Sequence, residues 1–120
     1  VGEAPQDWAG CHLEMPGDLD GDGIEDVAIG ARQNDEGGSN AGKIYLLLGH
    51  ASGWSLNEPV STLPSVVGDF EDLEIGYTYA AGDVNADGLA DLILRHSGED
   101  RFYIMMNTGF DAFQLVQVID

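Results

Sequence analysis

Two aspartate-rich segments of nine residues carry the side chains best suited to chemistry. They cover residues 18–26 and 83–91, and both read D-x-[DN]-x-D-G-x-x-D. Carboxylate, amide and carbonyl oxygens are the ligands that Ca²⁺ prefers in proteins, and the ion takes about six to eight of them at about 2.3–2.6 Å. A spacing that places oxygen donors on alternate residues of a tight loop therefore predicts two calcium sites.

The first segment offers a complete set of donors. Its predicted ligands are the carboxylates of Asp18, Asp20, Asp22 and Asp26 and the main-chain carbonyl of Ile24. Gly23 allows the sharp turn between them, because glycine adopts a positive φ without steric cost. A solvated acidic turn without metal is disfavoured here, since four crowded carboxylates repel one another unless a cation offsets their charge.

The second segment repeats the pattern with one carboxylate fewer. Its predicted ligands are the side chains of Asp83, Asn85, Asp87 and Asp91 and the main-chain carbonyl of Leu89. Because the amide of Asn85 is uncharged, we expect this site to bind calcium more weakly than the first. In both sites the spacing favours a structural ion over a catalytic one, since the loop itself fills the coordination shell.

An EF-hand begins with the same residues and is the competing interpretation. Its loop ends on a bidentate Glu at the twelfth position, and those positions here are Ile29 and Leu94. The residues that follow each loop, 27–31 and 92–94, are short apolar runs bounded by Gly or polar residues, which is typical of strands. The EF-hand interpretation is therefore rejected.

The 120 residues carry 22 acids against four bases, a formal net charge of -18. Such a chain disfavours nucleic acid and anionic membranes as partners, because both are polyanions. No apolar stretch approaches the roughly 20 residues of a membrane span, and we expect no signal peptide within these residues. Because it begins at Val1 without Met, we expect a processed or excised segment. The single Cys11 excludes an internal disulfide and is expected to be a small apolar filler.

A longer repeat surrounds the two loops. An apolar-Gly step precedes each loop, in Trp8-Ala9-Gly10 and Ile75-Gly76, and a polar turn and an apolar strand follow it, at 43–49 and 102–107. A period near 65 residues with about four short strands predicts an all-β fold of propeller blades. We expect the blades at residues 1–65 and 66–120. The apolar strands predict sheets that are buried on both faces.

This arrangement resembles the FG-GAP repeats of integrin alpha subunits and their bacterial relatives. The apolar-Gly steps, both Asp loops and the passage Gly30-Ala31 … Gly42-Lys43-Ile44-Tyr45 carry the resemblance. It implies two four-stranded antiparallel blades, calcium in hairpin loops, and an extracellular or cell-surface binding platform. Two departures are that neither copy has the Phe of the FG step and that Arg95-His96-Ser97 replaces the Gly-Ala-Pro-like segment in the second copy.

Two blades fall short of the closed ring of about seven that the resemblance implies. Isolated blades expose apolar faces and strand edges, which favours association. We therefore expect either a fragment of a longer propeller or a homo-oligomer, with three copies giving six blades. The alternating segment 113–119 is expected to be a strand that completes a neighbouring blade.

The expected function is adhesion or protein interaction without catalysis. His12, His50 and His96 lie in no catalytic motif, and neighbours such as Cys11 and His12 point to opposite faces of a strand. The contact surface is expected on rim loops that include 34–40, Trp54 and the Tyr77/Tyr79 region. Trp8 and Trp54 are themselves expected to be core or packing residues. The alternatives are a calcium-stabilised sugar-binding propeller and the accessory propeller of a secreted enzyme, so the partner is a protein or a glycan.

Overall fold

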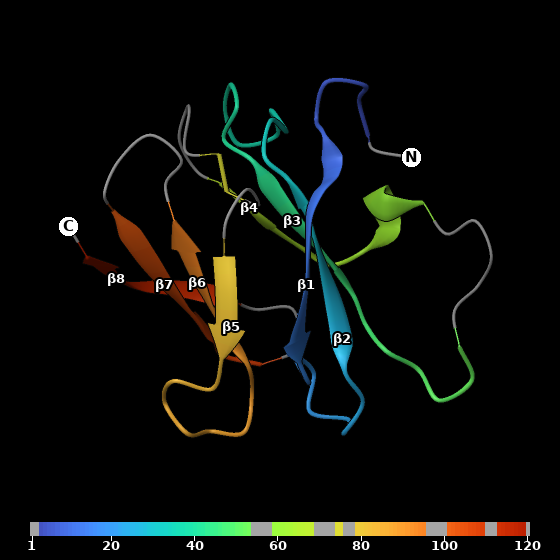
Figure 1. Ribbon diagram of the computed structural model, residues 1–120, viewed down its shortest axis with the longest axis vertical. Coiled ribbons are helices and arrows are strands. Elements are labelled where there is room, and N and C mark those ends of the chain that lie inside the picture. The colour runs from blue at the N-terminus through green and yellow to red at the C-terminus, as the bar shows by residue number, and fades with distance from the viewer. Residues whose placement is uncertain are drawn as a thin grey trace.

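The computed structural model describes residues 3–53, 59–68, 74–75, 79–95, 101–109 and 113–119, which form two antiparallel four-stranded sheets (Figure 1). The first sheet contains β1 (Ala9–Gly17), β2 (Asp26–Ala31), β3 (Lys43–Leu47) and β4 (Ser65–Val67), with the 3₁₀ helix η1 (Val60–Thr62) before β4. The second contains β5 (Tyr79–Gly82), β6 (Asp91–Arg95), β7 (Phe102–Asn107) and β8 (Phe113–Ile119). In each sheet, neighbours in sequence are neighbours in space. The prediction of two four-stranded antiparallel blades is confirmed.

The ends of the two sheets differ from the predicted boundaries. The predicted division between residues 65 and 66 falls inside β4, which pairs with β3 and belongs to the first sheet. The prediction that 113–119 completes a neighbouring blade is wrong, because β8 pairs with β7 of its own sheet. A short connection returns the chain antiparallel to the strand it has just left, which is the commonest arrangement of consecutive strands.

One face of each sheet packs against the other sheet. Successive side chains of a strand point to opposite faces, so alternate residues of β2, β3 and β4 share what we call the front face of the first sheet. Its buried residues are Ala28, Ile44, Leu46 and Val66, and the back face of the second sheet meets them with Leu92, Leu94 and Tyr103. This shared cluster is the core of the molecule.

The first strands of the two sheets, β1 and β5, lie next to each other (Figure 1). Backbone contacts add to the side-chain core, since Gly42 forms an isolated parallel bridge with Ile75. A Cβ atom at position 42 would lie 2.3 Å from the Ile75 oxygen, and Gly42 has a φ of +85°. Glycine is therefore the residue that allows the two segments to approach so closely.

The apolar strands β3 and β7 were both predicted to be buried on both faces, and only β3 is. β3 is buried from Lys43 to Leu46, as predicted, whereas Phe102 of β7 is 42% exposed and residues 104–106 are half-buried. The difference arises because the first sheet covers only the back face of the second. Among the described residues, no helix is long and apolar enough to cross a membrane.

Candidate metal centre

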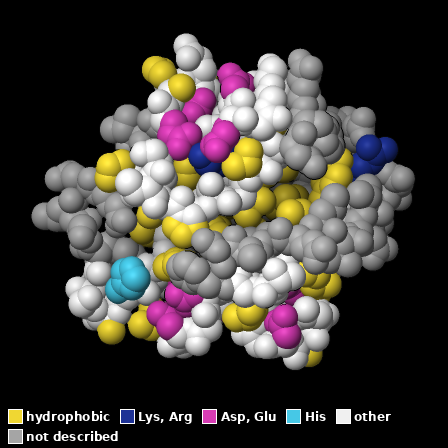
Figure 2. Space-filling model, turned by 180° about the vertical axis from the view of Figure 1, so that it is seen from behind, with side chains coloured by type: hydrophobic (Ala, Val, Ile, Leu, Met, Phe, Trp, Pro, Cys, Tyr) yellow, Lys and Arg dark blue, Asp and Glu magenta, His cyan; other side chains and the backbone are white. Residues whose placement is uncertain are grey.

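The two acidic loops occupy the same place in both sheets. Residues 18–25 join β1 to β2, and residues 83–90 join β5 to β6, with Gly17 opposite Asp26 and Gly82 opposite Asp91. Both are therefore hairpin loops, and both lie at the same edge of the molecule (Figure 1). Figure 2 shows the molecule from behind. Acidic side chains gather at its upper and lower ends, and hydrophobic side chains lie between them.

Three carboxylates converge in the first loop. Asp18, Asp20 and Asp22 each offer one oxygen, and these atoms lie within 4.8 Å of one another. The backbone fixes this cluster, because the amides of Gly21 and Gly23 donate to Asp18 Oδ1 and Oδ2 at 2.6 and 2.7 Å. The loop thus holds three carboxylates close together, a donor set that suits a hard divalent cation.

The pKa values in this loop reflect the crowding of charge. Although burial opposes it, the amides of Gly23 and Gly21 lower the pKa of Asp18. Burial and the negative charges of Asp22 and Asp26 raise the pKa of Asp20, against the opposing hydrogen bond from the Asp22 amide. A bound cation would offset this repulsion, so the electrostatics of the loop fit a metal site.

The second loop has the same internal hydrogen bonds. The amide of Gly88 donates to Asp83 Oδ2 at 2.8 Å, as Gly23 does to Asp18, and the amide of Leu89 donates to Asp87 Oδ1 at 2.9 Å. Asn85 takes the place of the middle carboxylate, and its Nδ2 donates to Asp87 Oδ2 at 3.1 Å. The second loop therefore keeps the geometry of the first, although it has one negative charge fewer.

The last aspartate of each loop is buried and braces the hairpin. Asp26 accepts from the amides of Leu19 and Gly49 at 2.6 and 2.7 Å. Asp91 accepts from the amides of Val84 and Asn107 at 2.9 and 2.8 Å. A carboxylate has about four lone-pair sites, so these bonds leave room for a metal. Their ligation, like that by the Ile24 and Leu89 carbonyls, stays a prediction.

Asn107 connects the two loops, which spacing alone does not reveal. Its buried side chain donates from Nδ2 to the Leu19 oxygen at 2.8 Å and to the Ala90 oxygen at 3.1 Å. No local sequence pattern marks this residue. In the structure, Asn107 and Gly49 hold equivalent positions, because each donates its backbone amide to the last aspartate of its loop. The first copy has no side chain at that position, since a Cβ there would lie 2.3 Å from the Glu25 oxygen.

The fourth position of each loop is left-handed as well as the sixth. Gly21 and Gly23 have φ values of +83° and +85°, and the corresponding residues Ala86 and Gly88 have +61° and +91°. A residue with a Cβ pays a conformational cost of about 1 kcal/mol in this region. The second loop therefore contains local strain that the first lacks, in addition to its lower charge.

The remaining candidates for chemistry are not brought together. His12 lies on β1 with Nε2 3.8 Å from Glu14, and His50 is exposed after β3. Cys11 is half-buried, with Sγ 3.5 Å from the Gly30 oxygen. His96 lies outside the described residues.

The predicted contact rim needs correction. Asn34 is buried, not exposed, because its Nδ2 donates to Asp7 Oδ2 at 2.9 Å beneath the turn it begins. Trp54, Tyr77 and the side chain of Tyr79 lie outside the described residues.

Trp8 is not a core residue. It is 52% exposed, and its ring packs against the guanidinium of Arg32, whose Cζ lies 4.4 Å from the ring centroid. Arg32 also pairs with Glu74 at 3.2 Å. Trp8 is therefore a surface packing residue that a cation holds in place.

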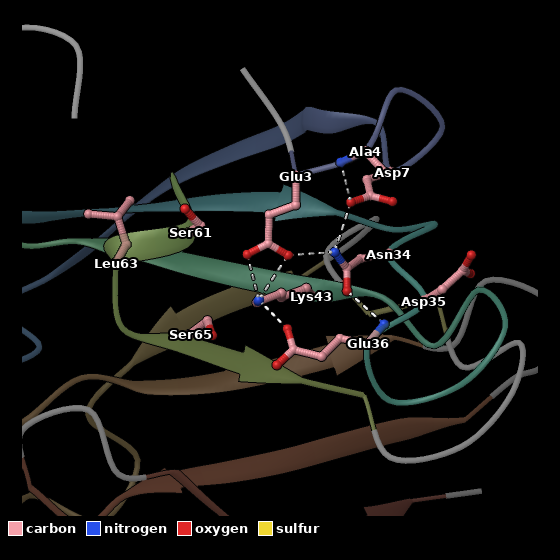
Figure 3. Close-up of a pocket in the computed structure, with 10 residues that line it drawn as sticks. All are labelled: Glu3, Ala4, Asp7, Asn34, Asp35, Glu36, Lys43, Ser61, Leu63 and Ser65. Atoms are coloured by element: carbon pink, nitrogen blue, oxygen red, sulfur yellow. Dashed lines mark hydrogen bonds and ion pairs between the residues drawn. The ribbon is translucent and has the colours of Figure 1, made fainter. Parts of the chain in front are cut away.

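A pocket of about 540 Å³ lies at the opposite end of the first sheet, beside the start of β3 (Figure 3). Lys43 is buried there, and its ammonium contacts Glu36 and both oxygens of Glu3, at 3.1 and 3.2 Å. Burial alone would lower the pKa of Lys43, but the hydrogen bonds that Lys43 donates to Glu36 and Glu3 raise it. Burial would raise the pKa of Glu3, but Lys43 lowers it. This network anchors the N-terminal segment to β3.

Comparison with protein families gives a match to the first loop and the strands around it. Residues 15–47, from the end of β1 through β3, match the family described as FG-GAP repeat. A comparison with curated protein sequences gave no match. Together with the hairpin geometry and the all-β fold, the match shows that residues 15–47 of this chain form an FG-GAP repeat, consistent with the integrin-alpha-like type.

Proposed function

We propose that this chain is a calcium-binding β-propeller module that serves as an extracellular interaction or adhesion platform without catalytic activity. The observation that carries the proposal is the convergence of Asp18, Asp20 and Asp22 in the hairpin of an FG-GAP repeat. FG-GAP repeats often bind calcium and are typically extracellular. The same loop geometry in the second sheet supports a second, weaker site.

The calcium is structural in this proposal. Carboxylates and a carbonyl from one short loop would hold the ion and thereby tie the two ends of a hairpin together. Extracellular calcium modules bind with dissociation constants of about 10⁻⁴–10⁻³ M. With free calcium tenfold above that constant, each site adds about 1.4 kcal/mol to stability by mass action, a useful fraction of the stability of a small domain.

Calorimetric titration with calcium tests the proposal. We expect two ions per wild-type chain, with the stronger site lost in Asp20→Ala. Glu25→Ala is the matched control, because Glu25 is an exposed acid of the same loop that is not among the predicted ligands. Calcium should raise the melting temperature of the wild type and of the control. The absence of both heat and thermal stabilisation in the wild type would refute the proposal.

The partner in this proposal is a protein or a glycan. A net charge of -18 disfavours nucleic acid, because both surfaces would be anionic. A sugar-binding role is favoured by one observation, the half-exposed ring of Trp8 held by Arg32. Glycan-array binding in calcium that disappears in Trp8→Ala would support this role over protein adhesion.

A further inference from the structure

The two acidic loops contact each other through predicted ligands and their direct neighbours. Both loops lie at the same edge of the molecule, and the strands that lead into them, β1 and β5, lie next to each other (Figure 1). The start of the first loop meets the end of the second, where the amide of Ala90 donates to the Asp18 oxygen at 3.4 Å. Asp18 is the first predicted ligand of its loop. Ala90 lies between Leu89 and Asp91, the last two predicted ligands of the second loop.

A side chain of the second loop also reaches the first. A Cβ atom placed on Gly21 would lie 3.5 Å from Leu89 Cδ2, so the Leu89 side chain packs against the turn of the first loop. Gly21 lies in that turn between Asp20 and Asp22. Leu89 is half-buried, and its main-chain carbonyl is a predicted ligand of the second site. One residue therefore belongs to its own site and contacts the other loop.

Asn107 adds buried hydrogen bonds to this contact. Its side chain is buried, and so are Leu19 and Ala90, whose carbonyl oxygens accept from its Nδ2. The same residue donates its backbone amide to Asp91, the last aspartate of the second loop. Buried carbonyls that lose their donor cost free energy. Separation of the two loops would therefore leave buried groups unpaired.

These contacts link the order of one loop to that of the other. Repulsion among carboxylates favours open conformations of an acidic loop, and a bound cation offsets that repulsion. Opening of the first loop would move the backbone of residues 18 and 19 away from Ala90 and Asn107, and the end of the second loop would lose its support. A first loop that is held closed removes these open states, so the second site binds without paying to order its last turn.

We propose that the two loops form one coupled unit, in which Ca²⁺ at either loop raises the affinity of the other, with Asn107 and Leu89 as the positioning residues. This inference rests on the proposed calcium binding. Linkage requires the effect to be equal in both directions, and coupling between two sites is typically about 5–150-fold in affinity. Because the link consists of a few hydrogen bonds and one apolar contact, we expect the lower end of this range, about 5–10-fold.

Charge alone predicts an effect of opposite sign. In Asp20→Ala the first loop loses one carboxylate and holds no ion. It stays more negative than the filled wild-type loop, because one removed carboxylate is less than the two charges of Ca²⁺. Through-space attraction would therefore make the second site bind slightly more tightly in this variant. Coupling instead predicts that the second site binds about 5–10-fold more weakly in Asp20→Ala than in the wild type with its first loop filled.

Calorimetric titration with calcium measures this factor in matched backgrounds. The second binding step of the wild type is compared with the single step of Asp20→Ala, and the factor between them should shrink when both chains also carry Asn107→Ala. Leu89→Ala is a second background in which the factor should shrink, because it removes the contact with Gly21 but keeps the main-chain carbonyl. Val84→Ala is the control, since it shortens an exposed apolar side chain of the same loop and should keep the full factor.

Hydrogen exchange reports on the loops themselves. In Asp20→Ala only the second loop holds calcium, yet calcium should slow exchange of the amides of residues 19–24 in the first loop. Protection confined to residues 83–91, or a second site as tight in Asp20→Ala as in the wild type, would overturn the proposal. Two ions bound independently would leave the proposed function intact. A wild type that binds no calcium would refute the proposed function and the coupling together.

Discussion

Asp26 shows how one residue joins the fold to the site. Its side chain is fully buried, and both oxygens accept backbone amides, one from the loop and one from Gly49, just after β3. Asp20 has a different position, because it is half-buried and crowded by other carboxylates that raise its pKa. Removing Asp26 therefore acts on folding, and removing Asp20 acts on metal binding.

This contrast predicts that the Asp26→Ala and Asp20→Ala variants differ in stability when a chelator removes calcium. Without calcium, Asp26→Ala should lower the free energy of unfolding by about 2–4 kcal/mol, because it leaves the buried amides of Leu19 and Gly49 without acceptors. Asp20→Ala should leave it unchanged or slightly higher, since repulsion is removed. Urea denaturation with chelator and then with calcium provides the measurement. Equal losses for both variants in chelator would contradict these roles.

At the scale of elements, the spacing of aspartates was sufficient to predict the loops, because a hairpin site is built from residues close in sequence. The apolar strands were predicted for the same reason. Asn107 was missed because its partner Leu19 is 88 residues away, and no local pattern encodes such a contact. The predicted burial of Trp8 in the core and the predicted exposure of Asn34 were wrong, because their exposure depends on Arg32 and Asp7, which only the folded chain brings to them.

The N-terminal segment is the element with the clearest dependence on pH. It is held through Glu3 and Lys43, whose charged forms stabilise each other. The folded pKa of Glu3 is lowered from 4.5, so its contribution is present above pH 4.5 and is lost as pH falls through the folded value. The folded pKa of Lys43 is raised from 10.5, so its contribution is present below that pH and is lost as pH rises through the folded value.

We therefore expect the segment from residue 3 to residue 8 to be protected from proteolysis at neutral pH and released in acid. Lys43→Met should release it at neutral pH and lower stability by about 1–3 kcal/mol, because the partly exposed Glu3 and Glu36 limit the loss through solvent screening. Limited proteolysis followed by mass spectrometry measures the release. Protection that persists in Lys43→Met would show that Asp7 and Asn34 hold the segment on their own.

At the scale of the whole molecule, the two sheets share an apolar core and a buried polar connection through Asn107. The apolar cluster includes residues of both sheets, so neither sheet buries its apolar face alone. Asn107 adds two hydrogen bonds at the edge of this cluster, to the Leu19 carbonyl of the first loop and the Ala90 carbonyl of the second. The two loops are thus coupled through the Asn107 side chain and through the Ala90 amide, which donates to the Asp18 oxygen at 3.4 Å.

Asn107→Ala should therefore disturb a loop that is distant in sequence. The backbone amide still donates to Asp91, but the Leu19 and Ala90 carbonyls lose their donor, at a cost of about 1–3 kcal/mol. Hydrogen exchange should increase in residues 18–25, and calcium should bind more weakly at the first loop although all of its predicted ligands remain. Ser52→Ala, in an exposed turn, is the control for shortening a side chain to alanine. If exchange increased only in the second sheet, the loops would be independent, and calcium at one would stabilise only its own hairpin.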